Sequence, residues 1–194
     1  MKSLFRKLIV AAAVVVASVP AFAGQFVVEL DRPIDAQSVA KMTDNGITLE
    51  ETLAAGTDSY AVFKASNAES LNAFLEALSI KPEKISEVLF INSPTVGGGK
   101  PANSSPRPDH DVFVIERPIP GVGFLGLDKK RKISKNSNAA IAKLGSVIEW
   151  DHSYLTSEGT YCVYRADSPE TLREHGALAG APIGKITAVR QEKY

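Results

Sequence analysis

The feature that most constrains the fold of this chain is an internal similarity between two of its segments. Residues 60–88 align without a gap on residues 161–189 when they are shifted by 101 positions. The opening stretches 26–29 and 113–116 also agree. Eight of the 29 aligned positions are identical: Tyr60/Tyr161, Val62/Val163, Ala65/Ala166, Glu69/Glu170, Leu71/Leu172, Lys84/Lys185, Ile85/Ile186 and Val88/Val189. The chain is therefore expected to contain two copies of one structural unit.

Residues 1–23 have the composition of an export signal. Lys2, Arg6 and Lys7 form a positive segment, residues 8–19 form a short apolar segment, and residues 21–23 (Ala-Phe-Ala) form a cleavage site after Ala23. The mature chain is expected to begin at Gly24 and to be periplasmic or secreted.

Charge and hydropathy narrow the range of partners. Removing the signal leaves 19 basic against 22 acidic residues, a formal charge of −3. This charge argues against nucleic acid as a partner. No later run of about 18 apolar residues is present, so no membrane span is expected.

The mature chain divides at a segment rich in glycine, proline and serine. Residues 92–110 contain 10 such residues among 19, which predicts a flexible linker rather than part of a core. The expected organisation is a first unit at residues 24–91, the linker at 92–110, and a second unit at 111–194.

Each unit reads as strand, helix, strand, strand, helix, strand. In the second unit the helix at 169–179 has clear end signals, because Ser168 is a good N-cap, Pro169 suits the first helical position and Gly180 follows the end. The other second-unit elements are expected at 111–117, 132–144, 147–156, 159–166 and 185–191.

This order predicts a ferredoxin-like βαββαβ unit in the α+β class, with both helices on one face of an antiparallel sheet. The strand at 112–115 is apolar at successive positions, which indicates burial on both faces. Each unit is also too small to be stable easily alone. We therefore expect the two sheets to pack together in one chain, as a monomeric, pseudo-dimeric α/β barrel.

Residues with metal-ligating or nucleophilic chemistry gather in one predicted hairpin of the second unit. Cys162 is the only cysteine, so it cannot form an internal disulfide, and it follows His152 by ten residues. A three-residue loop would place Tyr154 opposite Cys162 and His152 opposite Tyr164, with Trp150 on the same face. A two-residue turn would separate His152 from Cys162. We expect the three-residue loop.

Two further side chains are candidates for the same site. Glu116 ends the neighbouring strand, and His175 lies on the packed side of the second helix, where a structural histidine is the alternative. The expected metal ligands are thus Cys162, His152, Glu116 and His175. Thiolate, imidazole and carboxylate together suit nickel, zinc or copper.

A resemblance extends this interpretation. The segments 113–117, 137–139, 150–154, 161–164 and 172–175 together resemble a family of small bacterial nickel-binding ferredoxin-like proteins, largely a domain of unknown function, over about residues 111–192. The resemblance implies a ferredoxin-like unit that associates through its sheets, with nickel as the metal. By position it points to these residues: Glu116, Asn138, His152, Tyr154, Cys162 and His175.

The first unit departs from that pattern. It keeps Glu29 but has Glu51, Ala61 and Phe74 in place of the histidine, the cysteine and the second histidine. We therefore expect one site, in the second unit.

Three functions remain open at this stage. The leading hypothesis is an exported protein that binds nickel or a similar ion. The first alternative is a barrel-cavity enzyme or small-ligand binder with a reactive Cys162, in which Trp150, Tyr154, Tyr164 and Asn138 help to line the pocket. The second is an interaction module without catalysis. No phosphate-binding loop is present, and no catalytic set is assigned, which favours binding over catalysis.

Overall fold

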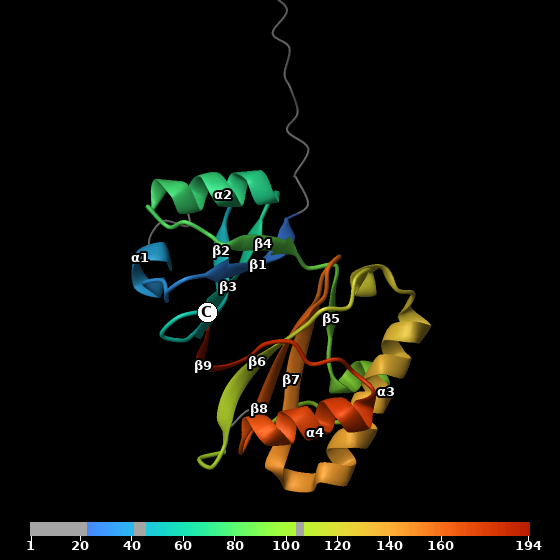
Figure 1. Ribbon diagram of the computed structural model, residues 1–194. Coiled ribbons are helices and arrows are strands. Elements are labelled where there is room, and N and C mark those ends of the chain that lie inside the picture. The colour runs from blue at the N-terminus through green and yellow to red at the C-terminus, as the bar shows by residue number, and fades with distance from the viewer. Residues whose placement is uncertain (1–22, 41–45, 104–106) are drawn as a thin grey trace, which may run out of the picture.

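The computed structural model describes residues 23–40, 46–103 and 107–194 (Figure 1). The predicted export signal lies almost entirely outside these residues. Among the described residues, no helix is long and apolar enough to cross a membrane.

The first unit contains six elements in the expected order. They are β1 (Gly24–Leu30), α1 (Ala36–Ala40), β2 (Thr48–Ala54), β3 (Ser59–Ala65), α2 (Ala68–Ala77) and β4 (Lys84–Glu87). Asn67 caps α2, since its side chain accepts a hydrogen bond from the backbone of Ser70 at 2.8 Å.

The second unit repeats this order. Its elements are β6 (Asp111–Arg117), α3 (Leu127–Leu144), β7 (Ile148–Leu155), β8 (Thr160–Ala166), α4 (Pro169–Ala179) and β9 (Ile186–Lys193). The bounds of β6 and α4 agree with the prediction. Helix α3 begins at Leu127 rather than at 132, so it also includes four consecutive basic residues, Lys129, Lys130, Arg131 and Lys132.

All the strands in the described part of the chain belong to one nine-stranded sheet with the order β4-β1-β3-β2-β9-β6-β8-β7-β5. Each unit contributes four strands in the ferredoxin-like order. Strand β2 pairs with β9, and the short strand β5 (Phe90–Asn92) pairs with β7. Only Val88 and Leu89 separate β4 from β5, so consecutive strands of the chain lie at the two ends of this order.

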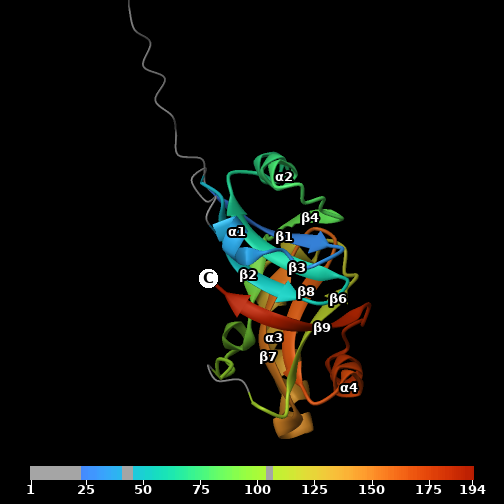
Figure 2. The ribbon, with the colours of Figure 1, turned by 90° about the vertical axis from the view of Figure 1, so that its left-hand side faces the viewer.

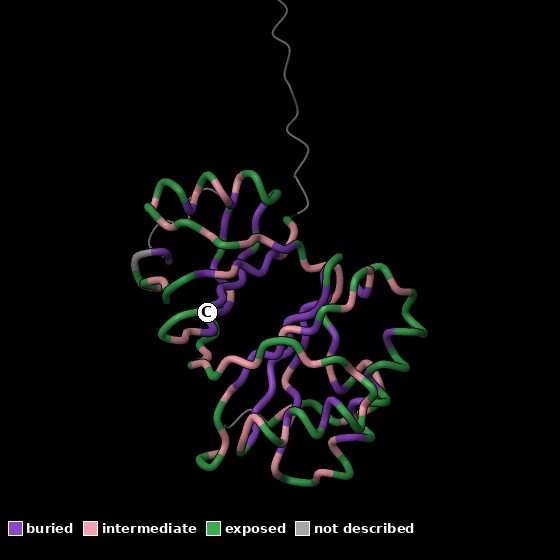
Figure 3. Tube along the Cα trace, in the orientation of Figure 1, coloured by how far each residue is buried: buried purple, intermediate pink, exposed green. Residues whose placement is uncertain are grey.

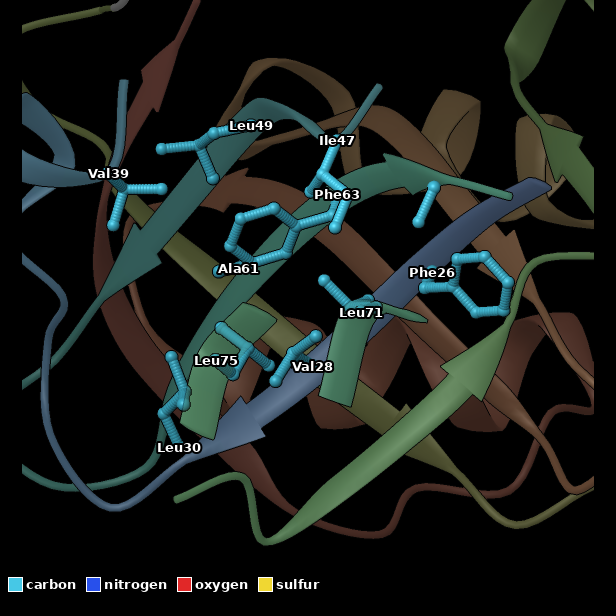
Figure 4. Close-up of a cluster of buried hydrophobic side chains, with 11 residues drawn as sticks. Phe26, Val28, Leu30, Val39, Ile47, Leu49, Ala61, Phe63, Leu71 and Leu75 are labelled. Carbon is cyan, nitrogen blue, oxygen red and sulfur yellow. The ribbon is translucent and has the colours of Figure 1, made fainter. Parts of the chain in front are cut away.

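The helices cover the outer sides of the strands (Figures 1 and 2). One hydrophobic core lies between α1, α2 and the first-unit strands, with Phe63, Leu71 and Leu75 at its centre (Figure 4). A second lies between α3, α4 and the second-unit strands and includes Leu172. Figure 3 shows the buried residues concentrated along the strands.

A third core contains residues of both units, and we call it the inter-unit core. Its buried members are Val27, Leu53, Tyr60, Val62, Val114, Tyr154, Tyr161 and Val163. Burial on both faces of the strands therefore agrees with the apolar pattern of residues 112–115. The fold is α+β with ferredoxin-like units.

The described residues of the predicted linker, 92–103 and 107–110, are packed rather than free. Residues Pro94–Gly97 form a short 3₁₀ helix, η2, against α3. A Cβ atom at Gly97 would lie 2.7 Å from the Cβ of Ser134, so glycine permits this close approach. Further along, Arg107 donates to the carbonyl of Ser146 at 2.7 Å. Backbone and side-chain contacts thus hold this segment on the second unit.

Candidate functional site

The β7–β8 hairpin has a different register from the expected one. The backbone N–H of Thr156 donates to the carbonyl of Gly159 at 2.9 Å, which leaves a two-residue turn. Ser153 therefore pairs with Cys162. An irregularity between Trp150 and His152 then shifts the register once more. The prediction of a three-residue loop was wrong.

This register separates the residues that were expected to meet. His152 is the partner of Val163, and Tyr154 is the partner of Tyr161, so both face the inter-unit core. Cys162, Tyr164 and Trp150 belong to the core beneath α3 and α4. We call these two sides the interior face and the helix face. His152 and Cys162 lie on opposite faces.

On the interior face, His152 contacts its counterpart from the first unit. Its Nε2 atom lies 3.2 Å from Oε2 of Glu51, which occupies the equivalent position 101 residues earlier. Tyr154 donates to the same oxygen at 2.6 Å, and Gln191 donates to Oε1 at 2.6 Å. Asp151 lies 3.5 Å from Nδ1 of His152. The histidine is thus held between two carboxylates.

These contacts set the charges of the pair. Burial alone would raise the pKa of Glu51, but the hydrogen bonds from His152, Gln191 and Tyr154 outweigh it and lower the pKa. Burial opposes the charged form of His152, yet Asp151 and Glu51 raise its pKa to about 8. At neutral pH this is an ion pair between the two units.

A second set of interior contacts is reciprocal between the units. Tyr60 of the first unit donates to Glu116 of the second at 2.6 Å, and Tyr161 of the second donates to Glu29 of the first. Burial, followed by these carboxylates, raises the pKa of both tyrosines. Glu116 therefore lies on the interior face.

On the helix face, a cavity of about 270 Å³ lies between the second-unit strands and the helices α3 and α4. We call it the helix-side pocket. Its polar and titratable lining residues are Asn92, Arg117, Asn136, Ser137, Ser153, Thr160, Cys162, Tyr164 and His175. Cys162 is buried and free, with Sγ 3.0 Å from the hydroxyl of Thr160.

A hydrogen-bonded group joins the helices to the strands at this pocket. The hydroxyl of Ser137 in α3 lies 3.1 Å from both the Tyr164 hydroxyl and Nε2 of His175. His175 is 1% exposed, and its Nδ1 atom has no partner among the described residues. Burial and then the charge of Arg117 lower the pKa of His175 to about 4. The ring is neutral at pH 7.

Arg117 is the charged residue of the pocket, and it was not among the residues expected from the sequence. It is the last residue of β6 and only 4% exposed. Gly180 adopts a positive φ of 65° after α4, and in the turn that follows the carbonyl of Pro182 accepts from Nη1 of Arg117 at 2.7 Å. Arg117 has the same parity as Phe113 and Ile115, which lie on the helix face. In the sequence, the alternation of strand β6 already places Arg117 on the same face as two apolar residues, and this pattern could have predicted that its charge is buried.

The expected site residues thus fall into two groups. Cys162 and His175 line the helix-side pocket, together with Tyr164 and Trp150. His152, Glu116 and Tyr154 lie on the interior face, and the side chain of Asn138 donates to the carbonyl of Pro94 at 3.0 Å. No group of three or more His, Cys, Asp or Glu residues that could hold a metal occurs within residues 23–40, 46–103 and 107–194.

Comparison with known proteins supports the sequence resemblance. A family model described as "Nickel responsive protein SCO4226-like" matches residues 113–189, within the second unit. The resemblance to a nickel-related family is therefore confirmed for this segment. No curated protein matches the chain.

Solved structures show a more distant similarity. Chlorite dismutase from Candidatus Nitrospira defluvii in complex with imidazole has 9% identity and a TM-score of 0.49, with 83% of each chain covered. A putative monooxygenase from Lactobacillus acidophilus has 9% identity and a TM-score of 0.38, with 87% of this chain and 93% of that chain covered. At these values neither similarity bears on the function of this protein.

Proposed function

We propose that this protein is an exported binding protein of nickel-related function and that its working site is the helix-side pocket. One observation carries the proposal. The segment that matches a family described as nickel responsive, residues 113–189, contains the three side chains Arg117, Cys162 and His175 that line this pocket. Export is supported by residues 1–23, with cleavage after Ala23.

The proposal includes a single-chain, pseudo-dimeric barrel that arose by duplication. It is supported by the matching strand orders, the β2–β9 and β5–β7 pairs, and the reciprocal Tyr60–Glu116 and Tyr161–Glu29 contacts. The mature protein is expected to be a monomer, and its mass in solution by light scattering tests this.

The pocket offers donor types that suit nickel, but among the described residues it offers only two such side chains, fewer than a nickel ion coordinates. Cys162 supplies sulfur and His175 supplies an imidazole whose Nδ1 lacks a partner, and both donor types suit nickel, zinc or copper. A neutral His175 at pH 7 needs no deprotonation before it binds a metal. With these two donors, the remaining coordination positions would belong to water or another small ligand. In this proposal the pocket would bind the metal and would not use it in catalysis.

Metal titration of the mature protein tests this assignment. Nickel binding is measured by calorimetry on the wild type, Cys162→Ala, His175→Gln and the control His152→Gln. We expect at least a tenfold loss of affinity in the first two variants and little change in the control, because His152 lies on the interior face. A loss confined to His152→Gln would overturn the assignment, and so would the absence of nickel binding by the wild type.

The second candidate function is the binding of a small organic ligand next to a reactive Cys162. It is favoured by the buried guanidinium of Arg117 near this thiol, because a fixed positive charge attracts an anionic ligand and opposes a bound cation. The rate of alkylation of Cys162 against pH, in the wild type and in Arg117→Leu, tests it. A thiol that reacts only after unfolding would contradict this candidate.

A further inference from the structure

Arg117 carries a buried charge whose neighbours among the described residues are the Cys162 thiol and the Tyr164 hydroxyl rather than a carboxylate. Its Nη1 atom donates to the carbonyls of Pro182 at 2.7 Å and Ala181 at 3.4 Å, but Nη2 is buried without a partner. No carboxylate of the described residues forms a salt bridge with it. A buried ion without a carboxylate partner is costly to stability, so an anion that reaches Nη2 would recover part of this cost.

No carboxylate among the described residues lines the pocket. Arg117 is the only Lys, Arg, Asp or Glu residue among its lining residues. Tyr164 stays neutral at pH 7, because burial and the nearby Cys162 raise its pKa. The net field in the cavity is therefore positive and arises from one guanidinium, which suits one negative charge on the occupant.

A second unpartnered group lies at the same cavity. Nε2 of His175 is engaged by the hydroxyl of Ser137 at 3.1 Å, whereas Nδ1 is buried without a partner. When the hydroxyl donates to Nε2, Nδ1 carries the proton and becomes a free donor. A carboxylate has two oxygens and accepts from two such donors, whereas chloride offers no such fork.

Part of the pocket wall is apolar, which points to an occupant with a hydrocarbon body. Side chains from β7, α3 and the β6–α3 loop form this wall: Ile119, Val122, Ile133, Trp150 and Leu155. At about 270 Å³ the cavity is slightly smaller than the usual range for drug-sized ligands. Inorganic anions such as sulfate would leave the apolar wall unfilled.

We infer that the helix-side pocket binds a small organic monocarboxylate, whose carboxylate pairs with Nη2 of Arg117 and whose apolar body packs against Trp150. The inference rests on this pocket being the working site proposed above. It names the ligand class that a guanidinium, a free imidazole nitrogen and an apolar wall recognise together.

The test compares carboxylates with their neutral amides. Benzoate and isobutyrate, with benzamide and isobutyramide as isosteres and sulfate as the inorganic anion, are titrated at constant ionic strength in metal-depleted buffer. Trp150 is the only tryptophan and lines the pocket, so its fluorescence reports binding, and calorimetry gives the affinity. We expect at least one carboxylate to bind tenfold more tightly than its amide. Equal binding of acid and amide, sulfate binding as tight as benzoate, or no binding of either carboxylate overturns the inference.

Variants locate the binding. Arg117→Leu should remove the preference for the carboxylate, while the exposed Arg190→Leu on β9 should keep it. Where Arg117→Leu does not fold, Ala179→Trp at the pocket wall should block binding, and the wild-type comparison of acid and amide still decides the matter. Unchanged binding in a folded Arg117→Leu overturns the inference. Since no nickel is present, carboxylate binding without nickel binding would leave this inference standing while the nickel assignment fails.

Discussion

The two faces of the β7–β8 hairpin place histidines in opposite electrostatic settings. His152 on the interior face lies between Glu51 and Asp151, whereas His175 packs on the helix face near Arg117. Both are buried, yet the pKa of the first is raised to about 8 and that of the second is lowered to about 4. The difference shows that the sign of the neighbouring charge, and not burial alone, sets the state of each ring. One face joins the units and the other offers a cavity.

The largest expected effect is a loss of stability when the carboxylate of Glu51 is removed from the interior face. Glu51→Ala removes the shared acceptor of His152, Tyr154 and Gln191, so the free energy of unfolding should fall by about 3–5 kcal/mol. Urea denaturation at pH 6.5 measures it. The control is Glu50→Ala, whose partly exposed side chain pairs with Lys64 and should lose under about 1 kcal/mol. Equal losses would contradict the assigned ion pair.

The helix side is tested by acid. The pKa of His175 is lower in the folded than in the unfolded chain, so its contribution to stability is present above pH 6.5 and is lost as pH falls toward 4. The loss should be about 3 kcal/mol. His175→Gln should remove this part of the pH dependence, as read from the difference between wild-type and variant urea curves at pH 4.0–7.0. Parallel curves would show that the ring does not titrate in this way.

The contribution of His152 to stability should be lost at alkaline pH instead. Its folded pKa is raised, so its contribution is fully present below pH 6.5 and is lost as pH rises through 8. The expected loss is about 2 kcal/mol and should be missing in His152→Gln. NMR titration of the imidazole protons gives the pKa directly, and a value below 6.5 would reverse the comparison.

The smallest expected effect is the loss of stability when one of the two equivalent tyrosines, Tyr60 or Tyr161, is changed. It tests whether the two units make equivalent contacts with each other. Tyr60→Phe and Tyr161→Phe each remove one hydrogen bond to a carboxylate of the other unit. Each should cost about 1.5–2 kcal/mol, and the two losses should agree within about 0.5 kcal/mol. Thermal or urea unfolding of both variants at pH 7 measures this. Losses that differ by more than about 1.5 kcal/mol would argue against equivalent roles.

Capping residues and turn residues predicted the helices and strands of the second unit well, but they predicted the register of the β7–β8 hairpin poorly. Ser168, Pro169 and Gly180 fixed α4 because caps act within one turn. The pairing of Cys162 depended on the length of one turn, and that of Trp150 on an irregularity near Asp151. A change of one residue moves every side chain to the other face.

The sequence contained partial information about the contact between His152 and Glu51. These residues occupy equivalent positions of the internal repeat, and the difference between them was noted without the inference that they touch. The packing of residues 94–103 and 107–110 on the second unit was not available in this way. It depends on close approaches such as Gly97 to Ser134, which composition does not encode.

The pairing of β2 with β9 and of β7 with β5 has a consequence for the tendency of the sheet edges to aggregate. A bare sheet edge offers unpaired N–H and C=O groups to any passing strand, which is a route to aggregation. Here each unit shields an outer strand of the other. A unit produced alone would expose such an edge and would tend to recruit the missing strand from a second copy, by domain swapping. The short crossing at Val88 and Leu89 brings β5 onto the outer strand β7 of the second unit, while the β2–β9 pair covers the other junction.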